Sequence, residues 1–221
     1  MPSYSTTRSA CGLATLVLAL AGCTSKETRA LLQPPQALGN VLASEAARAA
    51  GAKKQVAVIS PDANWGPTST AEEAFRSAMK KRGFSIINAG SVTLGDPMRS
   101  RPGLKAADFF GALEKSTEAG AVVSFAGAPL LTENDVVRLR SGQHPPVLVV
   151  ATMTLGAVPG VATDRSFLAD LLGAGAIQLA IVDGADPSAA QPDRSDTDRA
   201  LFAQNYRFLR PARRQRKRPI F

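Results

Sequence analysis

Five short runs of apolar, largely β-branched residues recur along the chain, and each is separated from the next by a segment with helical spacing. Continuous apolar runs of this length are typical of strands that are buried on both faces. Strands that alternate with helices build a parallel sheet with helices on both sides. We therefore predict an α/β fold with a doubly wound sheet in the strand order 2-1-3-4-5, with a mixed α+β fold as the alternative. The predicted strands are Gln55–Ser60, Phe84–Asn88, Ala121–Phe125, Pro146–Ala151 and Ala176–Val182.

Capping signals and periodicity predict the helices between these strands. Thr132 is a typical N-terminal cap, and Gly83 and Gly173 are typical residues for helix ends. The predicted helices are Thr68–Lys81, Leu104–Thr117, Leu131–Arg140 and Asp164–Leu172.

The segment before the first strand has a different character. Residues 24–35 are polar and end in Pro34-Pro35, which favours an extended tether. Gln36–Ala50 has the apolar spacing of a short helix, and Gly51 is suited to end it.

The basic charge of the chain is concentrated at its C-terminal end. The chain has 26 Lys and Arg against 18 Asp and Glu, a net charge of +8. Without Arg8 and the seven basic residues from Arg207 to Arg218, acids and bases are equal in number. Residues 210–221 are therefore expected to form a disordered tail that binds an anionic lipid or wall polymer, or remains solvated without a partner. The tail residues proposed for this contact are Arg210, Arg213, Arg214, Arg216, Lys217 and Arg218.

Residues 185–209 join the last predicted strand to this tail. Residues 185–198 are rich in Pro, Ser and Asp, as linkers are. Thr197–Leu209 is either a final helix or ends in a short strand over Asn205–Leu209, where aromatic and polar residues alternate.

The N-terminus resembles the signal of a bacterial lipoprotein. An apolar stretch from Cys11 to Ala21 is about half of the roughly 20 residues that a membrane-spanning helix needs, but it fits an export signal. It ends in Leu20-Ala21-Gly22-Cys23, which resembles the lipobox. The resemblance implies cleavage after residue 22 and acylation of Cys23, with palmitate-like chains that hold the protein on the membrane. By resemblance to enterobacterial sorting rules, Thr24 in place of Asp favours the outer membrane over the inner one. The alternatives to a lipobox are an ordinary secretory signal and a buried apolar helix with a chance cysteine.

Composition and motifs argue against several chemistries. The single histidine, His144, and two cysteines exclude a multi-histidine metal site, a Cys₄ zinc ribbon and a disulfide framework. Neither a P-loop nor a G-x-S-x-G nucleophile motif occurs. We therefore predict no metal and no cofactor, and the export signal argues against nucleic acid as a partner.

Polar and small residues follow the predicted strands, where ligands bind in open parallel sheets. The loop after the first strand combines a hydroxyl, a carboxylate, an amide and the only tryptophan. These residues are either a ligand site or ordinary turn and cap residues. The candidates are Ser60, Asp62, Asn64, Trp65, Gly127, Thr152 and Asp183.

Residues 53–184 resemble the N-terminal lobe of type 1 periplasmic solute-binding proteins. The resemblance rests on the succession QVAVIS, SIINAG, AVVSFAG, VLVVATM and AIQLAIVDG. It implies a flavodoxin- or Rossmann-like sheet and a ligand bound between two lobes. The sequence ends where a second lobe would begin, so we expect a partner surface, a shallow site or loss of solute binding.

These observations lead to one main hypothesis about function and two alternatives. The main hypothesis is a non-catalytic binding or accessory module, anchored in the envelope with its domain in the periplasm, whose partner is an envelope protein or a second copy. The alternatives are a hydrolase-type enzyme that uses Asp62, Asn64 and Asp183, and a structural anchor that uses the basic tail. The expected segments are a signal peptide (1–22), an acylated tether and helix (23–52), a Rossmann-like domain (53–184), a linker with a last element (185–209) and the tail (210–221).

Overall fold

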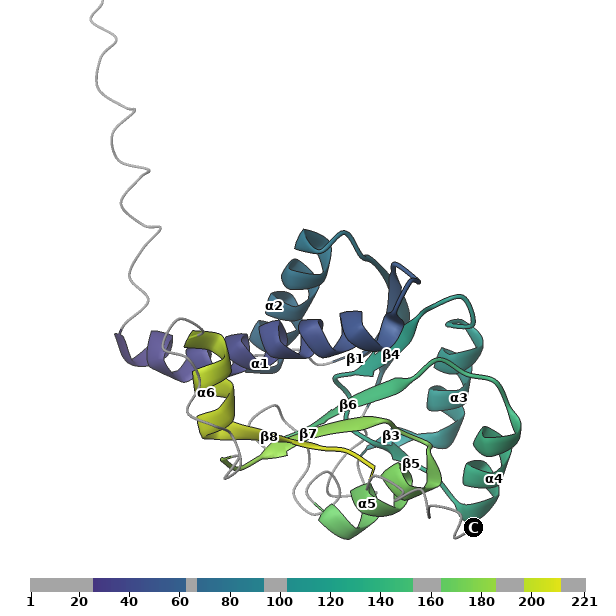
Figure 1. Cartoon of the computed structure of the whole chain (residues 1–221). Coiled ribbons are helices and arrows are strands. Elements are labelled where there is room, and N and C mark those ends of the chain that lie inside the picture. Colours follow the sequence, from purple (N-terminus) through teal and green to yellow (C-terminus); the bar gives the residue numbers. More distant parts are fainter. Residues whose placement is uncertain (1–25, 63–66, 94–102, 153–163, 186–196, 212–221) are drawn as a thin grey trace, which may run out of the picture.

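The main sheet has six strands in the order β2-β1-β4-β6-β7-β8 (Figure 1). The computed structural model describes residues 26–62, 67–93, 103–152, 164–185 and 197–211. The first five strands of the sheet are parallel and stand in the predicted 2-1-3-4-5 order, while β8 is antiparallel to β7. The doubly wound α/β fold is thus confirmed. The strands are β1 (Gln55–Pro61), β2 (Ser85–Val92), β4 (Ala121–Ser124), β6 (Val147–Ala151), β7 (Leu179–Asp183) and β8 (Tyr206–Leu209).

Helices cover both faces of this sheet. Side chains alternate along each buried strand, so every strand presents apolar side chains to both groups of helices. Val56 and Val58 of β1 pack with one group of helices, and Ala57 and Ile59 pack with the other. The first group is α1 (Lys26–Ala50), α2 (Pro67–Lys81) and α6 (Thr197–Asn205). The second group is α3 (Ala106–Glu114), α4 (Glu133–Ser141) and α5 (Arg165–Ala174).

Helix α1 is longer than predicted. It begins at Lys26 instead of Gln36, and Pro34 and Pro35 lie inside it, so the expected extended tether is wrong for residues 26–35. The proline pair cannot donate hydrogen bonds to earlier carbonyls, but Pro35 is buried. Packing thus outweighs the local preference for an extended chain.

A close approach between α1 and α2 fixes the position of α1 on the sheet. A Cβ atom at Gly39 would lie 2.2 Å from the carbonyl oxygen of Ala71, so the helices meet backbone to backbone at this point. Because α1 leads into β1 through a short turn, the two elements run in opposite directions. Helix α1 is about 37 Å long and β1 about 23 Å, so the first turns of α1 extend past the carboxyl edge of the sheet (Figure 1).

Three helix boundaries illustrate where capping decides the structure. Thr132 caps α4 through a capping box with Asp135, as its position predicts. Helix α5 starts after Asp164 and ends at Gly175, so the predicted end at Gly173 is wrong. Gly175 has φ of 76° and accommodates the left-handed turn that closes the helix, whereas Gly173 lies inside it.

The predicted helix over Leu104–Thr117 is also too long at both ends. Leu104–Lys105 forms strand β3, which pairs in parallel with strand β5 (Pro129–Leu130) as a separate two-stranded sheet. Leu104 is fully buried, so burial and pairing hold these residues extended. Helix α3 ends at Glu114, beyond which the chain forms turns.

Both alternatives for the C-terminal segment are correct in part. Residues 197–205 are the helix α6, and Tyr206–Leu209 is the edge strand β8. Tyr206 is buried and packs against Phe202, with ring centroids 5.7 Å apart. The side-chain amide of Asn40 donates to Asp198 (2.8 Å), which ties α6 to α1. Within the described residues, no helix is long and apolar enough to cross a membrane.

Candidate functional site

The parallel strands bring four of the predicted residues to the carboxyl edge of the sheet. Ser60 lies near the end of β1, Thr152 follows β6, Asp183 ends β7, and Gly127 lies in the turn after β4. Asp62 follows β1 directly, with its amide donating to the carbonyl of Val92 (3.0 Å). Asn64 and Trp65 lie outside the described residues.

Ser60 is part of a hydrogen-bonded network that the sequence did not predict. Its hydroxyl donates to Glu72 Oε1 (2.7 Å), and Arg76 Nε donates to the same oxygen (2.7 Å). Arg76 Nη2 also donates to Asn88 Oδ1 (2.7 Å), so the network joins β1, α2 and β2. Glu72 is only 5% exposed, which explains why its charge needs these partners. The four-residue spacing of Glu72 and Arg76 on α2 was the available sequence signal.

The other candidates at this edge have mixed environments. The hydroxyl of Thr93 donates to Asp62 Oδ2 (2.6 Å) at the surface. Gly127 has φ of 85°, and its carbonyl accepts a hydrogen bond from the buried hydroxyl of Ser124 (2.7 Å) within this turn. Thr152 is fully buried, and its hydroxyl has no hydrogen-bond partner in the described part of the chain.

The geometry of the carboxyl edge limits its chemistry. Across the described ranges, no group of three or more His, Cys, Asp or Glu side chains could hold a metal ion. His144, the only histidine of the chain, precedes β6 and so lies at the opposite edge from Ser60. A Ser–His–acid triad therefore cannot form between Ser60 and this imidazole.

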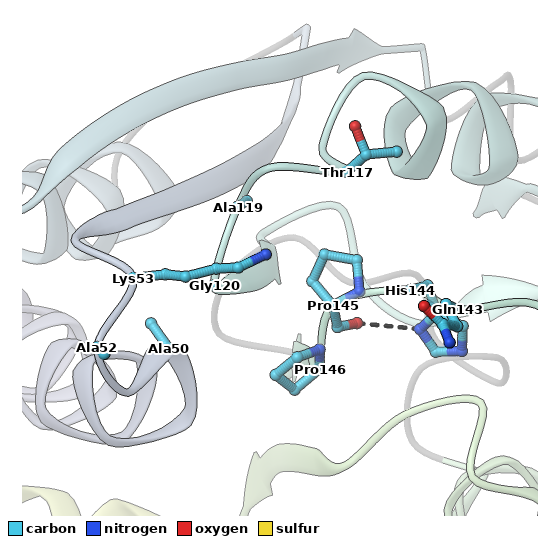
Figure 2. Close-up of a pocket in the computed structure, with 10 residues that line it drawn as sticks. All are labelled: Ala50, Ala52, Lys53, Thr117, Ala119, Gly120, Gln143, His144, Pro145 and Pro146. Carbon is cyan, nitrogen blue, oxygen red and sulfur yellow. Dashed lines mark hydrogen bonds between the residues drawn. The ribbon is translucent and has the colours of Figure 1, made fainter.

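A cavity of about 530 Å³ lies at the amino edge of the sheet, where β1, β4 and β6 begin. Sequence reasoning did not predict it, because three separate turns supply its walls and none carries a motif. Figure 2 shows Lys53 extending over the cavity, with Pro145 and Pro146 between it and His144. The lining residues are Ala50, Ala52, Lys53, Thr117, Ala119, Gly120, Gln143, His144, Pro145 and Pro146.

A second, smaller cavity of about 180 Å³ lies at the same edge, between α1 and the starts of β6 and β7. Glu45 lines it and bonds both Arg48 and Arg210, the latter at 2.9 Å. Burial alone would raise the pKa of Glu45, but the hydrogen bonds and charges of Arg48 and Arg210 outweigh it and lower the pKa. Arg210 also lies over the ring of Phe208, 5.0 Å from its centroid. The first residue of the predicted tail is thus held on the folded domain.

Comparison with known proteins found a similarity among solved structures. No protein-family model and no curated protein matches the chain. Among solved structures, the chain is similar to an ABC transporter solute-binding protein from Agrobacterium vitis, bound with alpha-D-tagatopyranose. The identity is 21% and the TM-score 0.43. The similarity covers 66% of this chain and 44% of that one, so this chain spans less than half the length of that protein.

Proposed function

We propose that the protein is a lipid-anchored, non-catalytic binding module of the bacterial envelope, with its α/β domain in the periplasm. The observation that carries the proposal is the short distance along the chain from the lipobox to the fold. Only Thr24 and Ser25 separate Cys23 from Lys26, the first residue of α1. Acyl chains on Cys23 would therefore hold the domain close to the membrane surface, since no long linker intervenes.

The direction of α1 suggests how the anchored domain is oriented. The first turns of α1 extend past the carboxyl edge, and its last turn meets the amino edge (Figure 1). An anchor at Cys23 would place the carboxyl edge nearer the membrane and the amino edge farther from it. Candidate residues such as Asp62 and Asp183 would then face partners at the membrane, for instance an envelope protein or a second copy.

The same orientation bears on the basic tail. Leu209 pairs with Ala180 near the start of β7, so the described chain reaches Arg210 and Pro211 at the amino edge. The tail that follows would begin on the side away from the protein's own membrane. We therefore favour a wall polymer over the lipid of the anchoring membrane as the anionic partner of the tail. The protein would then be both a binding module and a structural anchor.

The carboxyl-edge network supports binding over catalysis. The hydroxyl of Ser60 and the guanidinium of Arg76 share one oxygen of Glu72, so this carboxylate is already neutralised by a cation. A serine that acts as a nucleophile needs a general base beside it, and the carboxylate beside Ser60 is engaged by Arg76 instead. These groups are better explained as a brace between β1, α2 and β2.

The intact mass of the membrane-extracted protein tests the anchor. We expect a chain that starts at Cys23 and carries the mass of two or three acyl chains. The Cys23→Ser variant should lose this mass and leave the membrane fraction. A soluble, unacylated chain that begins at Met1 or Pro2 would contradict the proposal, and the basic tail would then become a candidate for nucleic-acid binding.

A further inference from the structure

The polar side chains around the larger amino-edge cavity differ from those at the carboxyl edge. Within the described part of the chain, the ammonium of Lys53, the hydroxyl of Thr117 and the amide of Gln143 have no hydrogen bond or ion pair. All three line the cavity and are exposed to solvent. The ammonium of Lys53 and the amide of Gln143 thus border a volume that is typical of small-molecule sites, whereas Figure 2 shows the Thr117 side chain directed away from Lys53.

Close packing fixes the turn that carries Lys53. Its backbone amide donates to the carbonyl of Ala50 (3.2 Å), and the amide of Gly120 donates to Gln55 (2.8 Å). A Cβ atom at Gly120 would lie 2.8 Å from the Cβ of Lys53 and 2.7 Å from the carbonyl oxygen of Ala50. The start of Lys53 is thus held against the start of β4, and only its flexible outer part remains to be ordered by a ligand.

The histidine is oriented by its own neighbour. His144 Nδ1 lies 3.0 Å from the carbonyl oxygen of Pro145 (Figure 2). A carbonyl can only accept a hydrogen bond, so Nδ1 carries a proton and donates. In the neutral imidazole, Nε2 then accepts hydrogen bonds, but Figure 2 shows this nitrogen on the side of the ring that faces away from Pro145 and Lys53.

Charge and shape narrow the class of ligand. Lys53 is the only residue with a full charge among the ten lining residues, and no acid is among them. The rings of Pro145 and Pro146 add an apolar wall beside it. We propose that this cavity binds a small hydroxylated organic anion, with its anionic group on Lys53 and a hydroxyl on Gln143. The inference does not depend on acylation of Cys23.

Calorimetric titration of the purified full-length protein tests this site, with D-glucuronate as the probe. D-glucose is the matched neutral probe, since it carries a hydroxymethyl group where glucuronate has its carboxylate. We expect glucuronate to bind at least about tenfold more tightly than glucose, because a hydrogen bond to a charged group contributes that much. Inorganic phosphate, a bare anion, should bind more weakly than glucuronate, and equal binding would overturn the role of the hydroxyls.

Two neighbouring lysines provide the matched variants. Lys53→Gln should remove the preference for glucuronate, whereas Lys54→Gln should keep it. Lys54 carries the same charge, but its ammonium lies 4.6 Å from the ring centroid of Phe84 and it does not line the cavity. The inference is overturned if glucuronate does not bind, or if it binds Lys53→Gln as well as the original chain.

Discussion

The two edges of the main sheet use their polar side chains differently. At the carboxyl edge, Ser60 and Arg76 both donate to the buried carboxylate of Glu72. At the amino edge, Lys53 and Gln143 line a cavity and contact no hydrogen-bonding partner among the described residues. A buried charge must be paired to be tolerated, whereas a solvated one is available to a ligand. Polarity alone therefore does not identify a binding site, and the partners of each polar group must be counted.

The two glycines that flank β4 give the first test of this contrast, because each belongs to one edge. Gly120 precedes β4 at the amino edge, and an added Cβ would lie within 3 Å of Ala50 and Lys53. Gly127 follows β4 at the carboxyl edge, where an added Cβ would meet nothing but φ is 85°.

We expect Gly120→Ala to lower the free energy of unfolding by about 3 kcal/mol, since the turn before β1 must move. Gly127→Ala should cost only about 1 kcal/mol, the strain of a left-handed residue. Chemical denaturation of both variants measures the difference. Equal losses would show that the amino-edge turn is not rigid.

The network of Ser60, Glu72 and Arg76 at the carboxyl edge gives the next largest expected effect on stability. Glu72→Ala should cost about 2–3 kcal/mol of unfolding free energy, because it leaves the Ser60 hydroxyl and the Arg76 guanidinium without their shared acceptor. Ser60→Ala removes one donor to Glu72 and a long bond accepted from Arg76 (3.5 Å), and should cost about 1 kcal/mol. Thermal unfolding of the two variants checks the order. If Glu72→Ala were as stable as the original chain, the network would not brace this edge.

The ion pairs of Glu45 predict a pH effect of moderate size. The folded pKa of Glu45 is lowered, so its pairing stabilises the protein above the pKa of the unfolded chain. This contribution disappears as the pH falls through the folded pKa, in the acidic range. Glu45→Gln should therefore lose less stability than the original chain between neutral and acidic pH. If the free energy of unfolding fell equally with pH in the two proteins, the prediction would be wrong.

Arg210→Ala should have a smaller effect at neutral pH. Its side chain is 43% exposed, and a partly exposed ion pair contributes about 0.5–1 kcal/mol. The loss should shrink in high salt, which screens the pair. Denaturant midpoints at two salt concentrations measure it, and a loss that salt leaves unchanged would point to the contact with Phe208 instead.

Much of the fold could be predicted from local sequence patterns. The β-branched run around Val58 and the four similar runs are strands, and they stand in the order predicted for a doubly wound sheet. Pro34-Pro35 led to a wrong expectation, because the packing of α1 against α2 outweighs a local signal. The strand β3 at Leu104 was missed for a different reason. It contains only two paired residues, which are too few to show a periodicity in the sequence.

The sites were predicted less completely than the fold. Ser60, Thr152 and Asp183 come to one edge as strand topology requires, but topology does not reveal that Glu72 engages Ser60. The amino-edge cavity combines residues near 50, 118 and 145, and only the folded sheet brings them together. No spacing rule connects turns that lie so far apart along the chain.

We propose that the anchored domain turns its carboxyl edge toward the membrane and its amino edge away from it. Cys11 and Cys23 are the only cysteines, so an introduced one can be labelled uniquely once the signal is cleaved and Cys23 is acylated. Asp62→Cys and Lys54→Cys place a fluorophore at the two edges of the reconstituted lipoprotein. We predict strong quenching by lipid-bound quenchers at position 62 and weak quenching at position 54. Equal quenching, or the reverse order, would contradict the account.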